Sequence, residues 1–399
     1  MKQRNLVFDN LRGICMLGVI AIHVGSMAVS DAVASPFLVL ITNILSRYSV
    51  PAFFFISGYG LFYSKPLEQP LRYGSFVKKR MKSIGLPYLL ASLLYLCYYA
   101  FLNRDMGVLD PSNILFSLFF GTAQYHIYFL VILIWFYLLF PLWRALMRGM
   151  EKIGLKLALP VLFAAQVLLF EGNFRFWTYP DWIASSPALL NLCNYRLNYF
   201  PFFYLFIFML GGVIARHYDK FQQLITGRKA LLTAFFTTSA GFNTWLFYRW
   251  TFKWQMPYES TVNYLQQLSL PGLVYTIASV LFFSMVIQSG RYPLKKALKG
   301  MSDRSFIIYL IHPVFIDQLE YGLNRTVGMQ RVPMEAFYLA VLLLSNYYMG
   351  YMACIFSVLY FLAYFLMTAK PRPEQSGEKL TTREKYSAKN LMRHPFLNR

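Results

Sequence analysis

The sequence predicts an all-α integral membrane protein with about ten transmembrane helices and both termini in the cytoplasm. Long apolar runs recur along the chain, and basic residues gather in alternate connecting segments. Of the 399 residues, 57% are hydrophobic and 14% are charged, whereas a soluble globular chain carries roughly a quarter charged residues. Disorder is excluded as the main state because a disordered chain has low hydrophobicity. The net charge of +21 would suit a nucleic-acid partner, but such binders are rarely this apolar, so no nucleic acid is expected.

Each apolar run has close to the roughly 20 residues that a helix needs to cross a bilayer. A shorter apolar stretch, 111–121, follows Asp110 and Pro111, and we expect it to form a re-entrant or interfacial segment. The last span is long enough to tilt or bend. The predicted spans cover residues 7–29, 37–63, 84–102, 125–146, 154–170, 198–215, 230–249, 270–289, 304–320 and 337–368.

The distribution of basic residues sets the predicted orientation. With the N-terminus in the cytoplasm, 29 of the 38 Lys and Arg residues fall in cytoplasmic segments and 7 in outer loops. Such an excess follows the positive-inside rule. Arg12 and Arg47 are left inside spans. We expect a polytopic membrane domain over 1–369 and a basic, disordered cytoplasmic tail over 370–399 that lies along anionic lipid headgroups.

The first span contains Arg12 and His23, two groups that are costly inside a bilayer and therefore point to function. Eleven residues separate them, so they lie roughly 20° apart around the helix and about 16.5 Å apart along it. Asp9 lies on nearly the same face and can orient Arg12. Two structural alternatives stay open, because Arg12 can extend to cytoplasmic headgroups and His23 can be a packed core histidine.

Arg47 in the second span is predicted to lie about as deep as His23. An arginine at that depth needs a buried partner or a wet cavity, so a lipid-facing position is not expected. Pro51 follows it and can bend the helix. Ser57 and Gly58 are small residues that permit close helix packing.

Two further histidines lie within predicted spans. His126 opens the fourth span, where an interfacial histidine is often without a special role. His312 lies in the middle of the ninth span, one turn after Tyr309, and Pro313 frees a backbone carbonyl one turn earlier. A kink with a packed imidazole is the alternative. No metal site is predicted, since these histidines lie far apart in sequence and lack companion carboxylates.

Together these blocks resemble the membrane acyltransferase-3 family, in particular its stand-alone O-acetyltransferases, over essentially the whole chain. One departure is Tyr128, where the family often has Trp. The residues that carry the resemblance are Phe8-Asp9-Asn10-Leu11-Arg12-Gly13 with His23, Ser46-Arg47-Tyr48-Ser49-Val50-Pro51, Phe53-Phe54-Phe55-Ile56-Ser57-Gly58-Tyr59, Lys78-Lys79-Arg80 with Pro87-Tyr88, the His126 segment, and Ser305 to His312-Pro313.

The resemblance implies acyl transfer from cytoplasmic acyl-CoA, most commonly acetyl-CoA, to a hydroxyl of an envelope polysaccharide or lipid-linked sugar. The acyl-CoA is a co-substrate, and no bound cofactor is implied. His23 is the expected general base, with an acyl-imidazole as the alternative role, and Arg47 is expected to stabilise the oxyanion. Tyr309 and His312 would orient a substrate. The donor side would comprise Asp9, Arg12, Lys78, Lys79 and Arg80 with Lys82 nearby, and the acceptor side His126 and Tyr128.

A polysaccharide or lipid-sugar exporter is the alternative function, because a buried polar line among ten helices would also serve transport. Transporters often carry internal pseudo-repeats with matched broken helices, and the sequence has no corresponding pair. Either function places the protein in the inner, cytoplasmic membrane as a multi-pass protein in contact with lipid.

Overall fold

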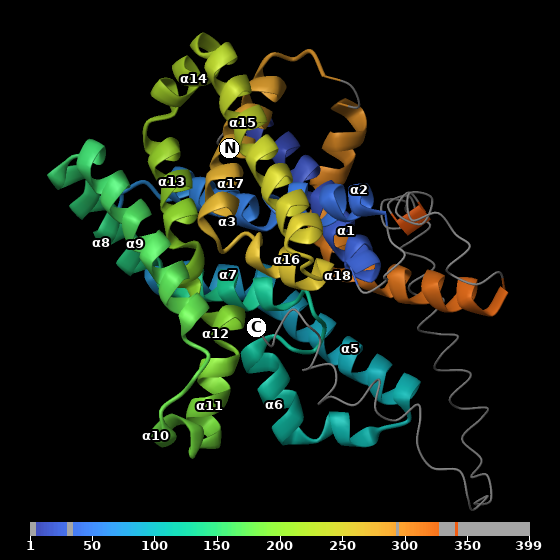
Figure 1. Ribbon diagram of the computed structural model, residues 1–399. Coiled ribbons are helices and arrows are strands. Elements are labelled where there is room, and N and C mark those ends of the chain that lie inside the picture. The colour runs from blue at the N-terminus through green and yellow to red at the C-terminus, as the bar shows by residue number, and fades with distance from the viewer. Residues whose placement is uncertain (1–4, 30–34, 293–294, 327–339, 342–399) are drawn as a thin grey trace, which may run out of the picture. The chain divides into compact units, whose positions relative to one another are not determined.

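A computed structural model describes residues 5–29, 35–292, 295–326 and 340–341 of the chain. All the regular elements within these residues are helices (Figure 1). The chain divides into two compact units, each described by itself below. Unit 1 comprises Met1–Gln69, Met147–Glu171 and Tyr204–Cys354, and unit 2 comprises Pro70–Leu146, Gly172–Phe203 and Ile355–Arg399.

Unit 1 contains the first and the last described helices. Its second span is composite, because the short helix α2, a π-helix and α3 follow one another. The elements of unit 1 are α1 (Leu6–Val29), α2 (Pro36–Val39), the π-helix Leu40–Leu45, α3 (Ser49–Ser64), α13 (Leu205–Arg216), α14 (Tyr218–Gly227), α15 (Lys229–Tyr248), α16 (Tyr258–Tyr264), α17 (Leu270–Gln288) and α18 (Lys295–Thr326), with most of α9 (Leu155–Arg175).

Unit 2 begins with one long apolar helical stretch, Tyr73–Asn103, which is formed by α4, a π-helical turn and α5. The chain crosses from unit 2 to unit 1 within α8 (Phe140–Ile153). The other elements of unit 2 are α4 (Tyr73–Arg80), α5 (Leu86–Asn103), α6 (Pro111–Phe120), α7 (Tyr128–Leu138), α10 (Asp181–Ala184), α11 (Pro187–Asn194) and α12 (Arg196–Tyr199).

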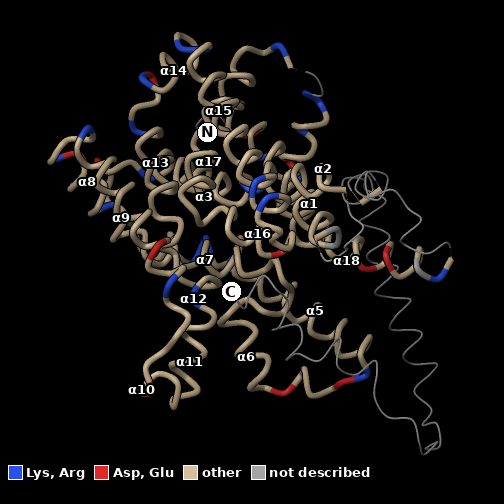
Figure 2. The backbone as a smooth tube through the Cα atoms, in the orientation of Figure 1, with Lys and Arg blue, Asp and Glu red and all other residues tan. Residues whose placement is uncertain are grey.

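Five of the ten predicted spans coincide with helices that are long and apolar enough to cross a membrane. These helices are Leu6–Ser26, Pro36–Ser64, Tyr73–Asn103, Leu155–Arg175 and Leu270–Gln288, and two bent helix pairs raise the number to seven. Charged residues are sparse along most of the apolar helices, whereas α18 carries several along its length (Figure 2).

The predicted span 125–146 is not a straight helix, because it forms the pair α7 and α8, bent by 66°. The predicted span 198–215 corresponds mainly to the helical segment Pro201–Arg216, and the chain bends by 97° just beyond it, before Tyr218–Gly227. Pro141 explains the first bend, because it has no N–H to donate to the carbonyl four residues earlier. The second bend falls at His217, whose φ of −123° and ψ of 43° are not helical.

Three other spans differ from expectation. The segment 230–249 forms α15 and 304–320 lies inside α18, which is 32 residues long, but neither passes as a span by length and composition because polar side chains interrupt both. Segment 337–368, apart from residues 340–341, lies outside the described residues, as do both termini and the tail 370–399. The orientation therefore stays a prediction.

The apolar stretch 111–121 forms α6, a helix of 10 residues. At about 1.5 Å per residue it is too short to cross a bilayer. It begins with Pro111 and ends before Gly121, whose φ of +66° is a left-handed helix cap. A re-entrant or interfacial position for α6 stays a prediction.

The helices α3 and α13 pack backbone to backbone through two glycines. A Cβ on Gly58 would collide with the carbonyl of Phe208, and a Cβ on Gly211 would collide with the carbonyl of Phe55. Small residues at such positions let helices approach within the membrane. Ser57, next to Gly58, is only half-buried.

In the same unit, α1 packs along α18. The Leu298 carbonyl occupies the space that a side chain at Gly13 would need, and further along both helices the His23 ring lies beside that of His312. The two helices therefore run in the same direction. The Gly13–Leu298 contact and the His23–His312 contact are separated by about 15 Å along α1 and by about 21 Å along α18.

We predict that Gly58→Ala destabilises the protein, because the added methyl group meets a backbone carbonyl that cannot move aside. The expected cost is about 1–3 kcal/mol, seen as a lower melting temperature of the detergent-solubilised protein by fluorescence-detected size exclusion.

The matched control is Gly60→Ala, two residues further along α3, where an added Cβ has no neighbour within 4 Å. This variant should melt at or slightly above the wild-type temperature, because Ala is about 1 kcal/mol better than Gly inside a helix. Equal melting temperatures for the two variants would contradict the close packing of α3 and α13.

Candidate functional site

Unit 1 brings together a pair of histidines from two different helices. The rings of His23 on α1 and His312 on α18 have centroids 5.0 Å apart and planes inclined by 34°. His312 is fully buried, and His23 is half-buried. The sequence singled out both residues, but it contained no sign that they meet.

Pro313 determines how His312 is held. A proline has no N–H, so the carbonyl of Tyr309 loses the helical partner that it would have at position 313. The Nδ1 atom of His312 lies 2.9 Å from this carbonyl oxygen and 3.0 Å from that of Ile308. Because carbonyl oxygens only accept hydrogen bonds, Nδ1 carries the proton and Nε2 of the neutral ring carries the lone pair.

Arg47 lies between the π-helix and α3 and is 6% exposed. Its Nε donates to the Asn43 carbonyl at 3.1 Å, and its Nη1 donates to Oε1 of Gln267 at 3.2 Å. Gln267 in turn donates to the hydroxyl of Tyr204 at 3.5 Å. Arg47 is close enough to interact electrostatically with His23, so the cation and the imidazole pair belong to one site.

The π-helix Leu40–Leu45 brings the Asn43 carbonyl to this place. It packs on α1 at Gly25, where a Cβ would meet the side chains of Thr42 and Asn43. Gly25 follows His23 by two residues. Single π-helical turns are rare and often occur at functional sites. This one contains Asn43, whose carbonyl accepts from Arg47, and it packs on α1 next to the turn that holds His23.

Arg12 lies near the N-terminal end of α1, whereas His23 lies near the other end of the same helix. Its Nη1 is 3.9 Å from a carboxylate oxygen of Asp9, and their side chains are 33% and 22% exposed. The next residue, Gly13, is the contact point of α1 with Leu298 in α18. Arg12 is thus half-exposed at the part of α1 that packs on the first turns of α18.

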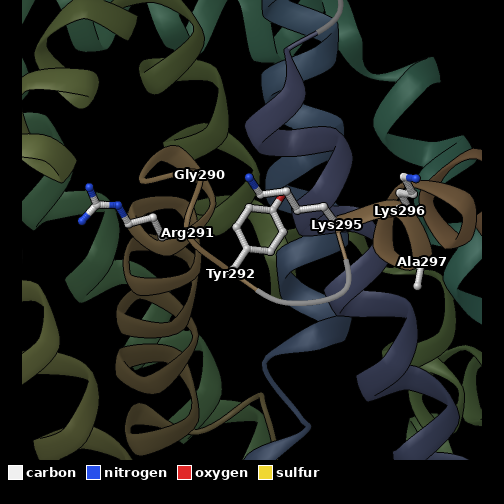
Figure 3. Close-up of a pocket in the computed structure, with 6 residues that line it drawn as sticks. All are labelled: Gly290, Arg291, Tyr292, Lys295, Lys296 and Ala297. Carbon is white, nitrogen blue, oxygen red and sulfur yellow. The ribbon is translucent and has the colours of Figure 1, made fainter.

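An open pocket of about 610 Å³ lies where α17 connects to α18. Figure 3 shows its lining, in which Lys295 lies over the ring of Tyr292 and Arg291 points away from Lys295. The Lys295 ammonium is 5.3 Å from the centre of that ring. Lys296 also lines the pocket. These cations belong to the same unit as Arg12, and the sequence suggested only a topological role for them.

The other predicted site residues lie in unit 2. Lys78, Lys79 and Arg80 form the last turn of α4, and the Arg80 guanidinium lies 5.2 Å from the ring centre of Tyr137. Since the two units are described separately, grouping these cations with Arg12 stays a prediction.

His126 does not open a helix, because α7 begins two residues later at Tyr128. It lies in the turn before α7, is 2% exposed, and packs edge-on against the rings of Tyr95 and Tyr125 at 5.8 and 5.7 Å. Its turn is compact because Gly121 lies against the backbone of Tyr128. The role of His126 and Tyr128 on the acceptor side stays a prediction.

Sequence reasoning missed Gln267 and Tyr204, the residues through which the Arg47 network continues. Both lie outside regular α-helices, between α16 and α17 and just before α13, so helical spacing could not connect them with Arg47. Among the described residues, no group of three His, Cys, Asp or Glu lies together as metal ligands do.

Comparisons with known proteins agree on one class. The model of a family described as an acyltransferase domain matches residues 5–369. The chain is also 24% identical, over 332 residues, to the "Putative membrane-bound acyltransferase YfiQ" of Bacillus subtilis (strain 168), an alignment that covers 77% of this chain and 79% of that protein. No solved structure matches the chain.

The family match covers most of the chain, the described helices include five to seven candidate membrane spans, and unit 1 carries a histidine pair beside a buried arginine. The chain therefore belongs to the acyltransferase-3 family and is a multi-pass membrane acyltransferase.

Proposed function

We propose that the protein transfers an acyl group, acetyl in the simplest case, from cytoplasmic acyl-CoA to a hydroxyl of a cell-envelope polysaccharide or lipid-linked sugar. The blocks that resemble stand-alone O-acetyltransferases, of the kind that acts on enterobacterial common antigen, support this choice of substrates. The single observation that carries the proposal is the pair of histidines in unit 1 with a buried cation close by.

In this proposal His23 is the general base. It takes the proton of the acceptor hydroxyl while the hydroxyl oxygen attacks the thioester carbonyl carbon, which forms the new C–O bond. The carbonyl electrons move to oxygen, and Arg47 stabilises the resulting oxyanion. When the C–S bond breaks, the CoA thiolate leaves and takes the proton from His23.

The donor's phosphates bind at the cytoplasmic end of α1 in this proposal. Arg12, oriented by Asp9, is the cation that the geometry of unit 1 supports best, because it is half-exposed and one face of α1 connects it with His23. The helical distance of about 16.5 Å between them suits an extended pantetheine arm. Lys78, Lys79 and Arg80 are proposed as further phosphate partners.

The base role predicts that His23→Ala abolishes acylation. A general base typically contributes 10²–10⁴-fold, so acylation of envelope glycans should fall below detection by mass spectrometry, while glycan export and protein amount stay unchanged.

His217→Ala is the control, because His217 is half-exposed beside Glu151 rather than in the apolar centre. Wild-type acylation by His23→Ala would contradict the base assignment. Loss of the glycan itself from the cell surface of cells lacking the protein would instead favour the exporter. The same spectra identify the acyl group and the acceptor.

The donor role predicts that Arg12→Ala weakens acetyl-CoA binding about tenfold, which is about 1.4 kcal/mol and typical of a lost charge-assisted hydrogen bond. Isothermal titration of the detergent-solubilised protein measures this. Arg12→Lys keeps the charge and should bind more tightly than Arg12→Ala, and an unchanged dissociation constant for Arg12→Ala would contradict the role.

The Arg47 network predicts different effects for two changes of Gln267. Gln267→Leu removes an acceptor from a buried guanidinium, which costs about 1–3 kcal/mol and lowers both melting temperature and activity. Gln267→Glu offers a charged acceptor, so stability should be kept while the rate falls, because the carboxylate neutralises the cation that the oxyanion needs. Gln266→Leu, at a half-buried neighbour, is the control. Equal rates for wild type and Gln267→Glu would contradict the oxyanion role.

A further inference from the structure

We propose that His312 is the positioning residue for His23: its Nε2 lone pair accepts the second N–H of the imidazolium that forms when His23 takes the hydroxyl proton. The inference rests on the proposed function, in which His23 is the base. It assigns the orienting partner of His23 to a residue on another helix, where the sequence around His23 offers no carboxylate.

The first step of the argument is the fixed tautomer. The Nδ1 atom of His312 is within hydrogen-bond distance of the carbonyls of Ile308 and Tyr309, at 3.0 and 2.9 Å. The proton stays on this edge of the ring, and the opposite edge can only accept. Pro313 makes this arrangement stable, because no backbone N–H competes for the Tyr309 carbonyl.

The second step is proximity. The ring centroids of His23 and His312 are 5.0 Å apart and the ring planes are inclined by 34°. Because the backbone carbonyls hold the His312 ring, a turn of the His23 ring is the movement that directs an N–H of His23 toward Nε2 of His312. His312 is fully buried, which makes an unmatched N–H of a charged neighbour costly and an acceptor correspondingly valuable.

The third step is the electrostatic setting of the proton transfer. Arg47, from the turn before α3, is close enough to interact electrostatically with His23, and the His312 ring of α18 lies beside the His23 ring. Tyr309 lies beside His312, with ring centres 6.2 Å apart, and α17 brings Tyr275, whose hydroxyl donates to the Leu45 carbonyl at 3.0 Å. The Arg47 cation opposes a positive charge on His23. A neutral acceptor such as His312 therefore supplies stabilisation that Arg47 cannot.

The test compares His312→Asn with His312→Gln. Asn places an amide near the position of Nδ1 and can keep the bond to the backbone carbonyls, but it has no acceptor at the position of Nε2. Gln reaches that position with an amide that can accept. Ser302→Ala, at another buried residue of α18, is the control for effects on folding.

The assay uses radiolabelled acetyl-CoA and inverted membrane vesicles that carry the host's own envelope glycan. For His312→Asn we expect kcat to fall on the order of 10–100-fold with KM for acetyl-CoA nearly unchanged, while His312→Gln recovers much of the rate. Loss of the acceptor destabilises protonated His23, so the acidic limb of the pH–rate profile moves to lower pH.

Wild-type kcat and acidic limb in His312→Asn would overturn the inference, as would an equal loss in His312→Gln. A raised KM with unchanged kcat would also overturn it, because His312 would then bind substrate. If His312→Asn does not fold, Pro313→Ala replaces it: the restored N–H competes for the Tyr309 carbonyl, and the limb should move in the same direction by less. An active His23→Ala variant would contradict the proposed base and is thus distinguishable from failure of the His312 role alone.

Discussion

A guanidinium buried in an apolar helix bundle has to be satisfied by the protein itself, and Arg47 imposes this constraint on unit 1. Arg47 is only 6% exposed, and an unmatched buried cation is very costly. The protein meets the demand with a backbone carbonyl of the π-helix and the side chain of Gln267, which is joined to Tyr204. Three separate segments of the chain are thereby tied to one positive charge.

The same constraint explains why the regular helices are interrupted where they are. A straight α-helix through 36–64 would direct the Asn43 carbonyl along its own axis into an ordinary helical bond. The π-helix and the turn that follows let Arg47 reach it instead. At α18 a different device achieves a similar end, since Pro313 leaves a carbonyl for an imidazole. In both places a polar side chain completes the hydrogen bonding that the backbone gives up.

The sequence was a good guide to the class of fold and a partial guide to its geometry. Apolar length predicted all five helices that qualify as spans, because burial in lipid requires about 20 apolar residues whatever the tertiary contacts. Apolar length did not predict the bend at Leu139, which Pro141 marks in the sequence, or the bend at His217, which depends on the local backbone conformation. For the site, the energetic cost of a polar or charged side chain inside the membrane identified His23, Arg47 and His312 as separate candidates. Their meeting depends on contacts between helices hundreds of residues apart, and spacing within one helix carries no such information.

The reciprocal glycines of α3 and α13 have a consequence for how this part of the protein tolerates change. Gly58 faces the backbone of α13 and Gly211 faces the backbone of α3. Both contacts therefore depend on the same distance between the axes of α3 and α13. A displacement that makes room for a methyl group at either glycine also opens the other. The double substitution of Gly58 and Gly211 should therefore lower the free energy of unfolding by less than the sum of the two single substitutions. The two glycines act as one packing constraint, although they lie far apart in the chain.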